Sequence, residues 1–151
     1  MDRRVFLGTL AGSLAAAFPA AGQSSSADIQ TRFQRSAELQ RQALQSLTDP
    51  GRAERLISNT HAELQSARSA MVIKASGMKF PDPLLEINTR NAGQALSLLQ
   101  AAHDALKTNR PGVVAAPDRE TSAPAAASPH LEAVRTNLEQ ALRLTSSVFV
   151  Y

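Results

Sequence analysis

The chain has 151 residues, of which 43% are hydrophobic and 19% charged, and this suits a single small domain. The absence of cysteine excludes disulfide bonds, a thiol nucleophile, cysteine-ligated zinc and iron–sulfur clusters. The net charge is only +3, the basic residues are interspersed with acidic ones, and aromatic residues make up 4%. This distribution argues against a nucleic-acid-binding protein, which would concentrate its basic residues on one face.

Residues 1–22 predict a cleavable export signal. Two arginines stand directly before a short, mildly hydrophobic stretch rich in Gly, Ala and Leu, and small residues at positions 20–22 offer a cleavage site before Gln23. The stretch is too short and too poor in large aliphatic residues to act as a permanent anchor. We therefore expect no stable membrane span in the mature form.

The motif at the start of this segment resembles the twin-arginine (Tat) signal of bacteria. Arg3, Arg4, Phe6 and Leu7 match its core, Arg-Arg-x-Phe-Leu, whereas positions 2 and 8 depart from the commonest flanking residues. The resemblance covers the leader alone. It implies export by the Tat machinery, with the Sec machinery as the alternative if this is an ordinary secretory signal. The expected location is periplasmic or secreted.

Residues 23–109 predict three consecutive helices. Each begins at side chains that can cap a helix, namely the pairs Ser25/Asp28, Asp49/Pro50 and Asp82/Pro83. The second helix should end near Ala75, with Gly77 as a left-handed cap.

One apolar face recurs at three- and four-residue steps in every predicted helix. In the first helix it comprises Ile29, Phe33, Ala37, Gln40, Leu44 and Leu47, and in the second Ala53, Ile57, Thr60, Leu64, Ala67 and Met71. In the third it comprises Leu85, Asn88, Ala92, Ala95, Leu99, Ala102 and Leu106. These faces are rich in alanine and contain polar residues, each of which needs a hydrogen-bond partner once buried.

Residues 110–127 are rich in Pro and Ala and predict a flexible linker, and residues 128–151 predict a fourth helix. Its apolar face comprises Leu131, Val134, Leu138, Ala141, Leu142, Thr145 and Val148. Short turns join the first three helices, so we predict an all-α protein, an antiparallel three- to four-helix bundle whose fourth helix is tethered by the linker. The linker is long enough for that helix to dock in either direction or to exchange between protomers.

Few groups in the sequence can carry chemistry. No metalloprotease, nucleophile-elbow or phosphate-loop motif occurs, so we assign no catalytic residue or cofactor and do not expect an enzyme. The candidate ligands for a metal or haem are His61 and His103, which flank the apolar faces of the second and third helices, and Met71, which lies on the apolar face of the second. In a hairpin centred on Lys79, His61 lies opposite roughly Leu98, and His103 is displaced by about 7–8 Å, too far for an easily shared ligand pair.

The leading functional hypothesis is a small exported helical protein that acts by binding another envelope protein or a copy of itself. Polar residues in the alanine-rich faces and an apolar C-terminus, Val148 to Tyr151, motivate it. The alternative is a periplasmic metal or haem carrier that uses His61 or His103.

Overall fold

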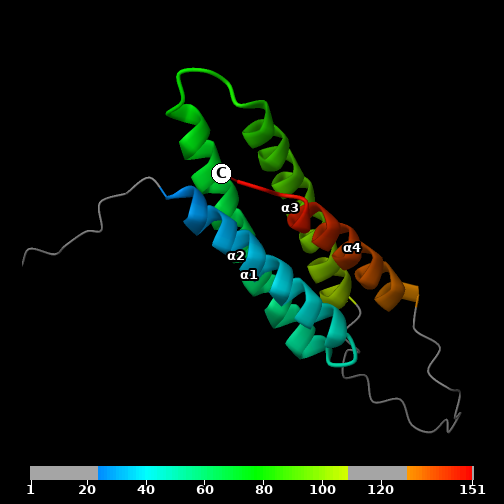
Figure 1. Ribbon diagram of the computed structural model, residues 1–151. Coiled ribbons are helices and arrows are strands. Elements are labelled where there is room, and N and C mark those ends of the chain that lie inside the picture. Colours follow the sequence, from blue (N-terminus) through cyan, green and yellow to red (C-terminus); the bar gives the residue numbers. More distant parts are fainter. Residues whose placement is uncertain (1–23, 109–128, 151) are drawn as a thin grey trace, which may run out of the picture.

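The computed structural model describes residues 24–108 and 129–150 and confirms the all-α prediction (Figure 1). Within these ranges the chain forms four helices and no strand: α1 (Ser26–Gln45), α2 (Pro50–Ser76), α3 (Pro83–Thr108) and α4 (Pro129–Ser146). The predicted signal at 1–22 and the predicted linker at 110–127 lie outside the described residues.

The four helices run alternately up and down and form one antiparallel bundle (Figure 1). α1 packs against α2 and α4, and α3 packs against the same two helices, whereas the diagonal pairs make no close contact. α4 therefore docks between α1 and α3 and runs antiparallel to both. The turn between α2 and α3 lies at the same end of the bundle as the start of α1 and the last residues of the chain (Figure 1).

The capping side chains predicted from the sequence are in place at three helix starts. The hydroxyl of Ser25 accepts the backbone N–H of Asp28 at 3.1 Å, and the Asp28 carboxylate accepts the N–H of Ser25 at 3.1 Å. Asp49 accepts the N–H of Arg52 at 3.0 Å, and Asp82 accepts the N–H of Leu84 at 2.9 Å. These bonds satisfy donors that a helix start leaves without intrahelical partners.

The predicted left-handed cap at Gly77 is wrong. Gly77 has φ −85° and ψ −6°, a right-handed conformation open to any residue, and α2 continues to Ser76. The helix closes instead because the N–H of Gly77 bonds the carbonyls of Ile73 and Lys74.

The core lies along the bundle axis, as the apolar periodicity predicts. Every residue predicted to face the core from α2 and α3 is buried. In α1 the buried face also includes Ser36 and Ala43, while Leu44 is only partly buried. The buried face of α1 is therefore wider than the predicted stripe.

The C-terminal segment, residues 147–150, covers the core beyond the end of α4. α4 has 18 residues and α3 has 26. The difference corresponds to about 12 Å of helix, and four extended residues span about 13 Å. Val148 and Val150 are buried in the core, whereas Phe149 is exposed.

Side chains of α1 and α3 hold this segment in place. Gln30 of α1 accepts the N–H of Val150 at 3.0 Å, and Asn88 of α3 donates to the carbonyl of Phe149 at 2.7 Å. Two of the apolar residues that the sequence suggested for partner binding are thus committed to the protein's own core, and Phe149 remains on the surface.

Candidate functional site

The structure keeps the three residues considered for a metal or haem site apart. Met71 is fully buried in the core, and His61 is partly exposed on α2. The Nε2 of His103 lies 3.8 Å from the carboxylate of Glu54. Glu54 precedes His61 by seven residues, which places the two about 10 Å apart along α2. Among residues 24–108 and 129–150, no three His, Asp or Glu side chains are grouped so that they could hold a metal ion.

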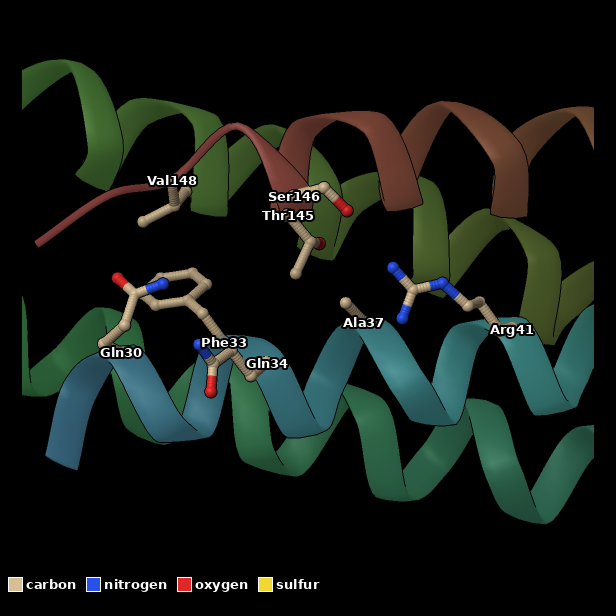
Figure 2. Close-up of a pocket in the computed structure, with 8 residues that line it drawn as sticks. All are labelled: Gln30, Phe33, Gln34, Ala37, Arg41, Thr145, Ser146 and Val148. Carbon is tan, nitrogen blue, oxygen red and sulfur yellow. The ribbon is translucent and has the colours of Figure 1, made fainter. Parts of the chain in front are cut away.

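A small crevice of about 270 Å³ lies between α1 and the end of α4 (Figure 2). Figure 2 shows Phe33 beneath Val148 at one side, and Arg41 extending from α1 toward α4 at the other. Arg41 already pairs with Glu38 on its own helix at 3.3 Å. The crevice therefore offers neither an uncompensated charge nor an acid–base pair for catalysis.

A surface at the α2–α3 end of the bundle gathers exposed apolar side chains. We call it the hairpin-end surface, and it comprises Val72, Ile73, Met78, Phe80, Ile87 and Phe149. Phe149 lies near the start of α3, because its carbonyl accepts a hydrogen bond from Asn88, the residue after Ile87. These six are all the large apolar residues that are exposed within the described ranges.

A groove of about 630 Å³ adjoins the hairpin-end surface, between the C-terminal half of α2 and the start of α3. We call it the α2–α3 groove. Val72, Ala75, Met78 and Pro81 form its apolar lining. Its charged lining residues are Arg68, Lys79, Asp82, Glu86 and Arg90.

The acidic residues of this groove are already engaged. The carboxylate of Asp82 accepts the N–H groups of Leu84 and Leu85 at the start of α3, and Glu86 pairs with Arg90 at 3.4 Å. By contrast, the Nε of Arg68 is buried without a hydrogen-bond partner. The groove thus combines an apolar lining with a net charge of +1, since its three cationic residues outnumber its two carboxylates.

No known protein family, curated protein or solved structure matches this chain. None of the helices in the described part is long and apolar enough to cross a membrane. Arg3, Arg4, Phe6 and Leu7, assigned to the export signal, lie outside the described residues.

Sequence reasoning missed the hairpin-end surface, although a signal for it exists. Ile73 and Ile87 lie off the core-facing stripes of their helices, and Phe80 lies in a turn directly before proline. Large apolar residues at such positions indicate exposure, and their concentration around one turn indicates a common surface.

Proposed function

We propose that this protein is an exported helical bundle that functions by binding, and that the hairpin-end surface is where its partner docks. One observation carries the proposal: the exposed large apolar side chains of the described chain all lie at one end of the bundle. Clustered apolar exposure of this kind marks interaction sites, whereas single exposed apolar residues are ordinary.

The degree of exposure supports this assignment. The exposed fractions are 75% for Phe80, 62% for Ile73 and 58% for Phe149. Burying one such side chain contributes about 1.5–3 kcal/mol, so contact with a partner would provide a driving force that the free bundle does not use.

The proposed location follows from the leader. A Tat or Sec signal at residues 1–22 would deliver the protein to the periplasm or beyond, and its partner would be another envelope protein or a second copy of the chain. A catalytic role has no comparable support, since neither the crevice nor the groove pairs a nucleophile with a base.

The metal or haem carrier is the weaker alternative. It requires His61 or His103 to gather further ligands, and in the described part of the chain His103 lies against Glu54 rather than near His61. Elemental analysis and visible absorbance of protein purified from the periplasm test it directly, and a stoichiometric metal or haem would revive it.

Site-specific photo-crosslinking in the producing cell tests the proposed surface. A photoreactive phenylalanine analogue replaces Phe80 in one variant and Ala101, an exposed residue nearer the other end of α3, in the control. We expect a discrete crosslinked product at position 80 that is lost when Ile73→Ser is added. Its mass distinguishes a second copy from another envelope protein. Equal crosslinking at both positions, or none at position 80, would contradict the proposal.

A further inference from the structure

We propose that the α2–α3 groove binds an anionic amphiphile, specifically a monocarboxylate on an unbranched apolar chain of about 8–12 carbons. This inference extends the proposed binding function, because Val72 and Met78 belong to both the groove and the hairpin-end surface. It does not need the same residues, since Ile73 and Phe80 do not line the groove.

The apolar part of such a ligand fits the lining of the groove. Its volume of about 630 Å³ lies within the range of small-molecule sites, which is about 300–1,000 Å³. Arg68 lies in α2 and Met78 lies two residues beyond its end at Ser76, and the helical stretch from Arg68 to Ser76 alone spans about 12 Å. A chain that starts near Arg68 would therefore run along Val72 and Ala75 and reach Met78.

Arg68 supplies the first reason to expect a negative headgroup. Its guanidinium lies against Gly93 of α3, with Nε 3.5 Å from the position that a Cβ would take there. The Nε is buried and unpartnered, and leaving a buried donor without an acceptor is unfavourable. A carboxylate bound beside Arg68 would gain a charge-assisted interaction with its guanidinium, and a small shift of that side chain would let the Nε donate to it as well.

Lys79 and the state of the groove carboxylates supply the second reason. Lys79 forms no ion pair with any residue in the described ranges, whereas Asp82 caps α3 and Glu86 neutralises Arg90. The three cationic lining residues, Arg68, Lys79 and Arg90, outnumber the carboxylates of Asp82 and Glu86, so the groove lining carries a net charge of +1. The groove is therefore complementary to an anion and unsuited to a cationic amphiphile.

Calorimetric titration of the mature protein, residues 23–151, with decanoate below its micelle concentration tests the inference. We expect saturable binding of decanoate, and at least tenfold weaker binding of acetate, which lacks the chain, and of decyltrimethylammonium, which reverses the charge. Arg68→Gln should weaken decanoate binding at least tenfold. Arg135→Gln, at an exposed position on α4, should leave it unchanged.

Glu86→Gln should raise the affinity for decanoate, whereas Arg68→Gln should lower it. Glu86→Gln removes a negative charge from the groove and frees Arg90, so decanoate should bind several-fold more tightly. Partly unfolded protein also binds amphiphiles through exposed apolar surface, so the gain supports the inference only in a variant that stays folded. Circular dichroism of each variant checks that the bundle is intact.

Three results would overturn the inference. They are equal decanoate affinity in Arg68→Gln and Arg135→Gln, equal binding of the cationic amphiphile, or binding only to anionic phospholipid vesicles. If the protein bound only such vesicles, weaker vesicle binding by Ile73→Ser and Phe80→Ser would indicate that the ligand is a membrane surface. The proposed function would stand if decanoate failed while crosslinking at position 80 persisted, so the two failures are distinguishable.

Discussion

The side-chain amide of Gln40 in α1 donates a hydrogen bond to the hydroxyl of Thr145 in α4 at 3.0 Å, across the core of the bundle. The same hydroxyl donates to the carbonyl of Ala141 at 2.8 Å. Both residues are buried, and the oxygen of the Gln40 side chain has no protein partner. This bond gives α1 and α4 a directional contact, which an alanine-rich seam alone does not provide.

The Gln40–Thr145 bond predicts a non-additive pair of substitutions. Thr145→Val keeps the shape of the side chain but leaves the Gln40 amide buried without a partner, which should lower the free energy of unfolding by about 1–3 kcal/mol. Adding Gln40→Leu removes the stranded amide and should recover part of that loss. Urea unfolding followed by circular dichroism measures both variants. Losses that simply add up would show that the two side chains are not coupled.

The alternation in the C-terminal segment predicts that two adjacent residues respond differently. Val148→Ser exchanges a buried apolar side chain for a polar one and should lower the free energy of unfolding by about 1.5–3 kcal/mol. Phe149→Ser changes an exposed side chain and should shift the free energy of unfolding by no more than about 0.5 kcal/mol. Thermal and urea unfolding of the two variants provide the comparison. An equal loss in both would mean that the segment does not pack as described.

The capping pair at the start of α1 predicts a local pH dependence. Hydrogen bonds from the side chain and backbone N–H of Ser25 lower the pKa of the Asp28 carboxyl below its ordinary value of 3.8. Because the folded-state pKa is the lower one, this carboxylate stabilises the fold above pH 3.8, and the contribution is lost as pH falls through the folded-state pKa.

NMR titration of the Asp28 carboxyl measures this shift. Ser25→Ala removes the hydroxyl donor and should move the pKa of Asp28 back toward its ordinary value. An unchanged pKa in that variant would assign the shift to another group. The stability difference between the natural chain and Asp28→Asn should also shrink between about pH 5 and pH 2.

The helices and most of their buried faces follow from the sequence, because burial at three- and four-residue steps leaves a periodic record. Leu64, Leu99 and Val134 are typical of positions that this record identifies. The cap at Gly77 could not be identified in this way, since glycine tolerates several conformations and does not require the left-handed one.

The role of residues 147–150 and the existence of the groove depend on comparisons between distant segments. A covering segment is needed because α4 is shorter than α3. The hydrogen bonds that hold this segment connect it to Gln30 and Asn88, each more than sixty positions away in the sequence. The groove likewise depends on the register that brings Arg68 beside Gly93. A periodicity within one helix contains no information about such pairings.

The up-down order of the bundle has a practical consequence for anyone who wishes to immobilise or label this protein. The start of α1 and the segment that follows α4 lie toward the same end of the bundle as the turn between α2 and α3 (Figure 1). An affinity tag or dye attached near either of them would compete with a docking partner for space. The turn between α1 and α2, around Thr48, lies at the opposite end and is the better point of attachment for binding assays.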